Sequence, residues 1–448
     1  MLSAFPNSLK IPELRQRIFF TLGLVFICRL VAAIPIPGVD AIALKQLIEQ
    51  IQNTAGGSFL GLYNLFSGGA LQRFAVGSLG IMPYISASII LQLMTAVVPA
   101  LERLAREGET GREKITEYTR YLTIILCVVQ GFGMAVMLEN PGQLDINQRV
   151  VLFPGWGFRI MAVLTMTTGS MLLMWFGEQI TERGIGNGVS LVITVGIISL
   201  LPGAVQATVN MFTPVDGIAQ FSIFHLVGLL VTLFLVIAGV VAVTQAQRKI
   251  PVQYAKRVVG RKVYGGQSTY MPLRVNYSGV MPIIFAQAIL MFPTKLLSMV
   301  DIGFFKRVGA ALAYGTDLYN LIYALMILFF SYFWVATQFN PIQIADDLKK
   351  HGGYVPGIRP GRPTAEYLDK TMTRITLAGA VFLTIIAVIP SVMAQRLGIP
   401  WIVASFFGGT SLLIIVGVML DTMRQIESHL LTRHYDGFLK KGKLRSRR

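Results

Sequence analysis

The run GIGNG at residues 184–188 has the glycine content of a loop that cradles phosphate groups. Glycine lets a backbone approach a pyrophosphate closely, but the third glycine of this run is misplaced for the dinucleotide-binding pattern. That pattern also needs a strand–helix–strand unit around it, and the neighbouring sequence does not predict one. The run is therefore interpreted as a tight turn between two helices, without nucleotide binding.

Other patterns that carry enzyme chemistry are absent from the sequence. It has no GxxxxGK[ST] loop for ATP, no HExxH zinc motif and no GxSxG nucleophile motif. The four histidines are not paired at ligand spacing; they are His225, His351, His429 and His434. Cys28 and Cys127 each lie within an apolar stretch, which suggests neither a disulfide framework nor a metal cluster. We therefore expect no enzymatic activity, no metal and no cofactor, and a driving force that a partner supplies.

Ten apolar stretches dominate the chain. They lie at about residues 16–34, 76–98, 119–138, 157–177, 188–209, 222–244, 277–297, 316–337, 374–394 and 399–420. Each is long enough for a helix to cross a hydrocarbon layer of about 30 Å. Because 54% of the residues are hydrophobic and only 14% are charged, no large aqueous domain is expected. The sequence predicts an all-α polytopic membrane protein with ten transmembrane helices.

The charged residues are unequally distributed among these stretches. Most of the 39 lysines and arginines fall in alternate segments on one side, together with both termini. The positive-inside rule places that side in the cytoplasm. Arg29 belongs to neither side, because it lies inside the first stretch. All 22 acidic residues fall outside the middle of every stretch, which disfavours an ion-coupled solute carrier but leaves open a carrier built on backbone carbonyls.

Two of the stretches open with a similar motif. The run GIMPYISA begins at Gly80 and opens the second stretch, and GVMPIIFA begins at Gly279 and opens the seventh. Each is second in a set of five, so the helices are predicted to form two related halves, residues 1–215 and 216–448, of opposite orientation. The working site is then expected at their interface. A chance similarity between two proline-opened helices is the alternative.

A short apolar segment, residues 58–74, precedes the second stretch. It is too short to span a membrane, and glycine pairs lie before it and inside it. Such a helix between flexible glycines is typical of a re-entrant or plugging element. An interfacial helix on the outer leaflet is the alternative.

Two large loops, residues 245–276 and 338–373, carry much of the cytoplasmic positive charge. The first is expected to contain a hairpin around residues 258–266. The second is expected to form a short helix that ends at His351, and then an extended, proline-stiffened strand with Arg359 at its tip. Thr364 is expected to cap the next helix. The basic residues considered for docking are Arg248, Lys249, Lys256, Arg257, Arg261, Lys262 and Arg359. They suit acidic proteins or ribosomal RNA, or else a solvated face that orients the chain.

Several long motifs together resemble the bacterial SecY family, the central subunit of the protein-conducting channel. They are IPELRQRI, GIMPYISASII, TERGIGNG, YVPGIRPG and FFGGTSLLI, in that order along nearly the whole chain. The resemblance implies a clamshell of two inverted pseudo-repeat halves with an hourglass pore, a re-entrant plug helix and a lateral gate. It implies a channel that passes unfolded secretory polypeptides across the membrane and releases transmembrane segments sideways into lipid.

The resemblance also assigns roles to individual residues. The pore ring would consist of Ile85, Ile89, Val189, Ile193, Ile284 and Ile414, with Val189 where an isoleucine is common. The plug would include Leu60, Leu62, Tyr63, Leu65, Phe66, Leu71 and Phe74. The lateral gate would include Ser88, Gln92, Gln130, Phe285, Gln287 and Phe292. Branched aliphatic side chains suit a pore ring, because they exclude water and ions yet offer a passing polypeptide no specific bonds.

The partners that the resemblance implies are the SecE and SecG subunits, the ATPase SecA, a ribosome with its RNA, signal peptides and nascent chains, and membrane lipids. The expected location is the bacterial plasma (inner) membrane, with both termini in the cytoplasm. A secondary solute carrier and an intramembrane enzyme are the functions of other classes that stay open.

Overall fold

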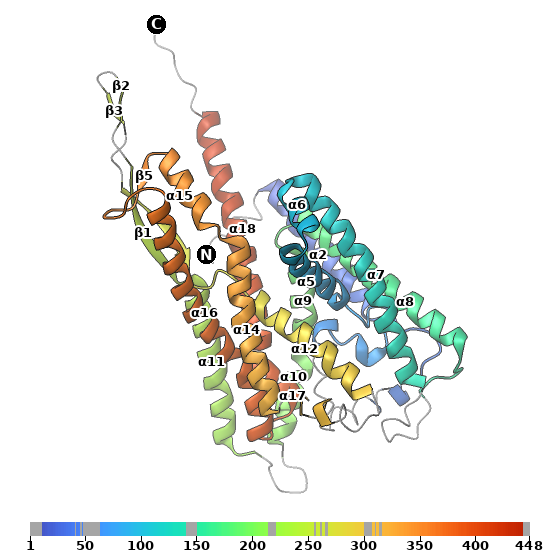
Figure 1. Cartoon of the computed structure of the whole chain (residues 1–448). Coiled ribbons are helices and arrows are strands. Elements are labelled where there is room, and N and C mark those ends of the chain that lie inside the picture. Colours follow the sequence, from blue (N-terminus) through green and yellow to red (C-terminus); the bar gives the residue numbers. More distant parts are fainter. Residues whose placement is uncertain are drawn as a thin grey trace. The chain divides into compact units, whose positions relative to one another are not determined.

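The computed structural model describes residues 11–40, 42–44, 47, 63–139, 150–213, 221–254, 257–259, 262–264, 268–299, 307–309, 311–312 and 316–441. The chain forms two compact units, Met1–Thr213 with Ile414–Arg448, and Pro214–Leu413. Both are mostly helical (Figure 1). The first unit thus includes most of the last helix, although that helix lies at the C-terminal end of the sequence. The division into pseudo-repeat halves at residues 1–215 and 216–448 stays a prediction.

The first unit contains α2 (Pro12–Val31), η1 (Leu71–Arg73), α5 (Met82–Val97), α6 (Pro99–Arg106), α7 (Glu109–Glu139), α8 (Trp156–Arg183), α9 (Gly188–Ser199), α10 (Leu201–Phe212) and the greater part of α18 (Thr410–Lys441). The second unit contains the helices α11 (Ile223–Gln245), α12 (Met281–Met299), α14 (Asp317–Gln338), α15 (Pro341–Lys350), α16 (Arg362–Arg396) and α17 (Trp401–Phe407). Its strands are β1 (Gln247–Tyr254), β2 (Arg257–Val259), β3 (Lys262–Tyr264), β4 (Ser268–Arg274) and β5 (Gly353–Tyr354).

All ten apolar stretches coincide with helices. Within the described residues, seven helices are long and apolar enough to cross a membrane, or eight if α5 and α6 form one bent span. The helix α2 is less apolar, because its 20 residues include Glu13, Arg15, Arg17 and Arg29. The apolar part of α12 is short, Met281–Leu290. A membrane protein with many helical spans is thus confirmed, and the count of ten stays a prediction.

Two of the predicted stretches are interrupted rather than continuous. The fifth consists of α9 and α10, which meet at Leu200, and a proline lies in the first turn of α10. Proline has no N–H to donate and clashes with a preceding helical turn, so a new helix begins there. The tenth consists of α17 and α18, and Gly409 between them has a φ of 119°. Only glycine adopts that conformation without strain.

The two similar motifs have the same local structure. Gly80 has a φ of 58° and Gly279 a φ of 63°, and a helix starts two residues after each of them, α5 at Met82 and α12 at Met281. In each helix the second residue is the proline of the motif, a position where its missing N–H costs nothing. This correspondence supports a true internal repeat over a chance similarity.

The first unit is packed as a series of neighbouring helices. Within it α7 contacts α5 and α8, and α8 contacts α2 and α9. A partly buried ion pair joins α7 and α8 at one end of their hairpin, where the Nε of Arg159 donates to Glu139 at 2.6 Å. The same carboxylate accepts the N–H of Gly155 at 2.8 Å. With both partners in place, the charge of Glu139 is compensated despite its burial.

The second unit joins its loops to its helices through one apolar core. Strand β1 pairs antiparallel with β4 and β5, and β2 pairs with β3. The predicted hairpin around residues 258–266 is therefore confirmed as β2 and β3, whereas the longer β1–β4 pairing was not predicted. The buried core consists of Ile250, Leu273, Val335, Phe339, Val355, Leu368, Met372 and Ile375. These residues come from β1, β4, the C-terminal end of α14, α16 and the segment after β5. The core therefore attaches the basic loops to the helices of the second unit.

Candidate functional site

The plug candidates that the structure describes are buried in the first unit. Residues 63–67 are helical and are followed by the single turn η1. The buried plug candidates are Tyr63, Leu65, Phe66, Leu71 and Phe74. Leu60 and Leu62 lie outside the described residues. A helix on a leaflet surface would keep one polar face exposed, so this burial fits a segment folded into the unit.

The plug candidate segment contacts α9 closely. Gly68 has a φ of 65°, and a Cβ atom added to it would lie 2.7 Å from the Cα of Gly196. The Oγ of Ser199 lies 3.2 Å from the carbonyl oxygen of Gly68 and makes its shorter hydrogen bond, 2.6 Å, to the carbonyl oxygen of Gly196. Both the backbone conformation and the space therefore require glycine at position 68. The plug candidate segment therefore lies against the helix that carries the pore-ring candidates Val189 and Ile193.

Tyr63 connects the same segment to the start of α5 and to α7. Its hydroxyl lies 3.3 Å from the carbonyl oxygen of Leu79 and 3.5 Å from the Oε1 of Gln130. A phenol has one proton to donate, and the shorter contact to Leu79 is the better hydrogen bond. The contact with Gln130 brings a lateral-gate candidate next to a plug candidate.

The pore-ring candidates are distributed over both units. Ile85 and Ile89 lie one turn apart on α5 and are buried. Ile193 on α9 is buried, whereas Val189 is half-buried. Ile414 on α18 is buried and also belongs to the first unit, and buried Ile284 belongs to the second. Their meeting in one constriction stays a prediction.

The run at residues 184–188 forms the tight turn between α8 and α9, as predicted. Side chains accept its backbone N–H groups: Ile185 donates to Thr21 Oγ1 at 3.1 Å, Gly186 to Gln425 Oε1 at 2.8 Å and Gly188 to Thr181 Oγ1 at 2.9 Å. These donors are therefore occupied within the protein rather than directed at a phosphate group. The turn instead connects α2, α8, α9 and α18 at one end of the first unit.

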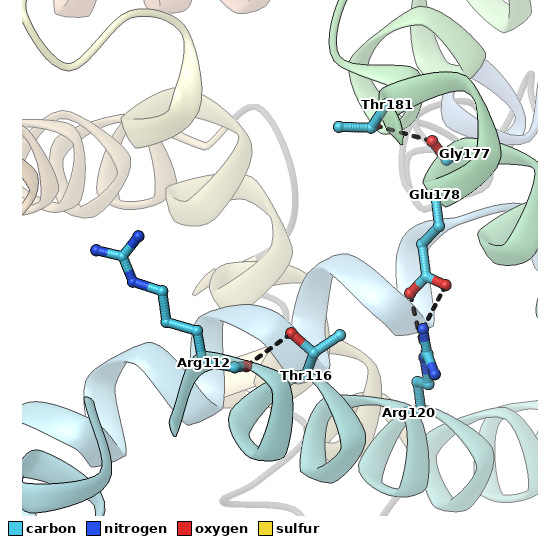
Figure 2. A network of polar contacts seen from close by, with 6 residues as sticks. All are labelled: Arg112, Thr116, Arg120, Gly177, Glu178 and Thr181. Atoms are coloured by element: carbon cyan, nitrogen blue, oxygen red, sulfur yellow. Dashed lines mark hydrogen bonds and ion pairs between the residues drawn. The ribbon is translucent and has the colours of Figure 1, made fainter. Parts of the chain in front are cut away.

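An ion pair supports α8 just before this turn. Arg120 on α7 donates from Nε and Nη2 to the two carboxylate oxygens of Glu178, at 3.2 and 2.7 Å (Figure 2). One turn further on, the hydroxyl of Thr181 donates to the carbonyl oxygen of Gly177 at 2.9 Å (Figure 2). A bidentate arginine–carboxylate pair fixes orientation as well as distance. The pair therefore aligns α7 with the end of α8, where Thr181 accepts the N–H of Gly188.

The remaining lateral-gate candidates lie on α5 and α12. Ser88 and Gln92 on α5 are half-buried. Phe285 and Gln287 on α12 are buried, and the ring of Phe285 contacts Trp334 of α14 edge-on, with centroids 5.4 Å apart. The side chain of Phe292 lies outside the described residues. The gate assignment stays a prediction.

The docking candidates that the structure describes lie in the small sheets and in the turn after β5. Arg248 and Lys249 on β1 and Arg359 are exposed. Arg257 and Lys262 lie in the paired strands β2 and β3. Lys256 and Arg261 lie outside the described residues.

The conformation around Arg359 differs from the expected extended strand. The predicted helix end at His351 is confirmed, because α15 ends at Lys350. After β5, however, the chain forms a turn in which the N–H of Ile358 donates to the carbonyl oxygen of Val355 at 3.1 Å. Both side chains pack into the core of the second unit. The expected projecting strand is therefore wrong, because burying these two apolar side chains folds the segment back and leaves Arg359 at an anchored tip.

The predicted cap at Thr364 is also wrong. The N-cap of α16 is Gly361, and Thr364 is the third helical residue. Its hydroxyl donates to the carbonyl oxygen of Arg359 at 2.8 Å. Thr364 thus stabilises the tip of the loop instead of the first turn of the helix.

Several contacts at the site were not predicted, and Arg29, Ser199 and Gln425 make them. Arg29 donates from Nη2 to the carbonyl oxygen of Gly68 at 3.1 Å. Its position as a lone charge within an apolar stretch was a signal that could have identified it. Ser199, at the end of α9, and Gln425, in the middle of α18, carried no such signal, since uncharged polar residues occur at many helix positions without a specific partner.

Comparisons with known proteins identify the family of the chain. A model of the SecY family matches residues 75–423. The chain is similar to the protein translocase subunit SecY of Escherichia coli (strain K12), with 46% identity over 97% of this chain and 95% of that protein. It is similar to the SecY subunit of Mycobacterium tuberculosis (strain ATCC 25618 / H37Rv), with 45% identity over 98% of this chain and all of that protein.

The fold is similar to those of three solved structures. One is described as the structure of a protein conducting channel, with a TM-score of 0.60, 16% identity and coverage of 96% of this chain and 94% of that one. Another concerns the plug domain of a SecY protein, which stabilises the closed channel and maintains a membrane seal; its TM-score is 0.57, with 18% identity and the same coverages, 96% and 94%. The third is Sec61 in a canine ribosome–channel complex, with a TM-score of 0.55, 15% identity and coverages of 96% and 94%.

Proposed function

We propose that this chain, which belongs to the SecY family, forms the channel through which a protein translocase passes unfolded polypeptides across a membrane. One observation carries the proposal beyond family membership: Tyr63, Leu65, Phe66, Leu71 and Phe74 are buried in the first unit, and their segment lies beside α9, which bears two of the pore-ring candidates. A segment that fills the space beside a constriction at rest has the properties of a plug.

The aliphatic character of the ring candidates supports polypeptide passage over solute binding. A solute carrier recognises its substrate through polar or charged groups, whereas these positions present five isoleucines and a valine. The chain is proposed to be a passive conduit and not an enzyme, so a partner supplies the work. Its relatives are named translocase subunits, which favours this reading over the carrier and the intramembrane enzyme.

Lateral release of transmembrane segments is proposed to occur between α5 and α7 on one side and α12 and α14 on the other. Ser88, Gln92 and Gln130 would line the first side, and Phe285, Gln287 and Phe292 the second. Family membership supports this gate. Separation of the two sides would let an apolar segment move from the pore into lipid. The transfer of an apolar segment from water into lipid is favourable.

The proposed assembly contains SecE clamping the two halves and SecG beside them. SecA or a translating ribosome would bind the basic surface that includes Arg248, Lys249 and Arg359 and would drive the chain inward. The ribosome complex of the similar Sec61 channel supports the second partner. The proposed location is the bacterial inner membrane with both termini in the cytoplasm, which the distribution of basic residues supports.

Reconstitution tests the proposal. The full chain is co-purified with SecE and SecG, incorporated into vesicles, and tested for uptake of a signal-bearing polypeptide with SecA and ATP. Protected polypeptide is expected only when the signal, SecA and ATP are all present. A matched polypeptide without its signal sequence is the control. Equal protection of both polypeptides, or none of either, would contradict a signal-gated channel.

A further inference from the structure

Arg29 is a charged residue within an apolar helix. It lies in the last turn of α2 and is half-buried. Within the described part of the chain, no acidic side chain forms an ion pair with it. A charge at such a position is costly unless it is compensated, and intramembrane charges therefore mark functional contacts.

The compensation comes from the backbone of the plug candidate segment. The guanidinium donates from Nη2 to the carbonyl oxygen of Gly68 at 3.1 Å. The Oγ of Ser199 lies 3.2 Å from the same oxygen, but its one proton makes the shorter hydrogen bond, 2.6 Å, to the carbonyl oxygen of Gly196. Gly68 has a φ of 65° and lies against Gly196, so its carbonyl oxygen is held between α2 and α9. Arg29 is thus the principal donor to this acceptor, and the hydroxyl of Ser199 is a secondary contact.

A small cavity adjoins this contact and is too small to accommodate the segment in another position. It encloses space for about one water molecule, roughly 20 Å³, and Cys28, Arg29, Phe66, Ser67 and Gly196 are among its lining residues. The segment is therefore closely packed where Arg29 binds it.

We propose that Arg29 is a latch that holds the plug closed through the carbonyl oxygen of Gly68, with Ser199 as a weaker secondary contact. The latch rests on the proposed channel function and adds the residue that sets the resting seal. Because the acceptor is a backbone carbonyl, the contact depends on where the segment lies and not on its side chains. Movement of the plug separates the guanidinium from its acceptor, and that cost opposes opening at rest.

The simpler role for an arginine in the last turn of a helix is compensation of the helix dipole. That role needs only a positive charge, so lysine at position 29 would serve equally well. The latch needs the reach and the planar donor geometry of a guanidinium, so lysine should restore it only in part. Arg29→Lys therefore separates the two roles.

The first experiment measures the resting ion conductance of the reconstituted complex. Arg29→Gln is expected to raise the leak at least tenfold, Arg29→Lys to raise it less, and Ser199→Ala to raise it least. Arg17→Gln, an exposed arginine on the same helix, is the matched control and should leave the leak unchanged. A leak at the wild-type level in Arg29→Gln overturns the latch, and so does full rescue by lysine.

The second experiment measures the position of the plug directly. Ser67 is buried, and so are both native cysteines. In a Cys28→Ala, Cys127→Ala background, Ser67→Cys should be protected from a membrane-impermeant maleimide, and adding Arg29→Gln should raise its labelling several-fold. Unchanged labelling overturns the latch. If Arg29→Gln complexes do not assemble, the Arg29→Lys and Ser199→Ala variants are compared in the same two assays.

The two assays are run beside signal-dependent uptake. If the wild-type complex takes up no signal-bearing polypeptide, the proposed channel function fails. If it does so and the Arg29 variants have wild-type leak and labelling, the latch alone fails.

Discussion

The hydroxyl group of Thr364 donates a hydrogen bond of 2.8 Å to the backbone carbonyl oxygen of Arg359. Thr364 is almost fully buried at the start of α16, whereas Arg359 is exposed at the tip of the preceding loop. A buried helical residue thus fixes the backbone of an exposed basic one. Little backbone conformational entropy is therefore left to lose at Arg359 when a partner binds.

Replacing Thr364 with valine should therefore weaken partner docking without removing any charge. The substitution keeps the side-chain volume and removes the donor to Arg359, so SecA-driven export is expected to fall about threefold, equivalent to less than about 1 kcal/mol. The control is Thr373→Val on the same helix, whose hydroxyl bonds only to the preceding turn at Asp369. Equal losses in both variants would show a general effect on α16.

Reversing the charge of Arg359 should have a larger effect. Arg359→Glu replaces attraction to an acidic or phosphate-bearing partner by repulsion, so export by SecA should be severely reduced in a normally assembled complex with unchanged conductance. Arg359→Lys should function partly, because lysine lacks the planar donor fork. The matched control is Arg362→Glu, an exposed arginine three residues away. If Arg359→Glu exports at the wild-type level, the docking role is contradicted, and Arg359 serves only to set the membrane topology.

Polar substitution in the pore ring should raise the resting leak. Ile85 and Ile284 follow Gly80 and Gly279 at the same spacing, and both are buried. Asparagine at either position should let water and ions enter the constriction and should admit polypeptides with poor signal sequences. Ile90→Asn, on an exposed position of α5, is the control for helix integrity. Conductance and signal stringency at wild-type values in the single and double variants would remove both residues from the ring.

The lateral gate is tested by cysteine crosslinking. One cysteine replaces Ser88 or Ile89, and the other scans residues 285–290, in a chain without native cysteines. At least one pair is expected to form a disulfide at rest and to block export until it is reduced, because a closed gate brings α5 next to α12. If no pair crosslinks while export continues, the gate lies elsewhere.

The ion pair between Glu139 and Arg159 should contribute to stability. Glu139→Gln leaves the guanidinium of Arg159 without its countercharge, and Arg159 is itself partly exposed. We expect a loss of about 2 kcal/mol in the free energy of unfolding, at the low end for a buried pair because water can reach Arg159. Thermal unfolding in detergent measures it, with Glu182→Gln at the exposed end of α8 as the control. A melting temperature equal to that of the control would show that the pair stabilises little.

The sequence alone predicted the features that depend on neighbouring residues. Each of the ten apolar runs coincides with a helix in the described residues, because a membrane-spanning helix satisfies its own backbone hydrogen bonds. The hairpin of β2 and β3, the turn at residues 184–188 and the helix end at His351 were predicted for the same local reason. Family motifs then supplied the fold and the candidate roles.

Tertiary structure decided the features that depend on distant residues. Gln425 accepts from Gly186 across 239 positions, and the hydroxyl of Ser199 contacts the carbonyl oxygen of Gly68 across 131. No local pattern marks such partners, because a polar side chain on a helix can bond to water, to its own turn or to another element. The strand predicted after β5 was wrong for the same reason, because the segment's conformation depends on distant residues. Its prolines indicated an extended tip, but packing of Val355 into the apolar core folds the segment back. Packing thus selected among conformations that the local sequence allowed, because burial of apolar area outweighs backbone preference.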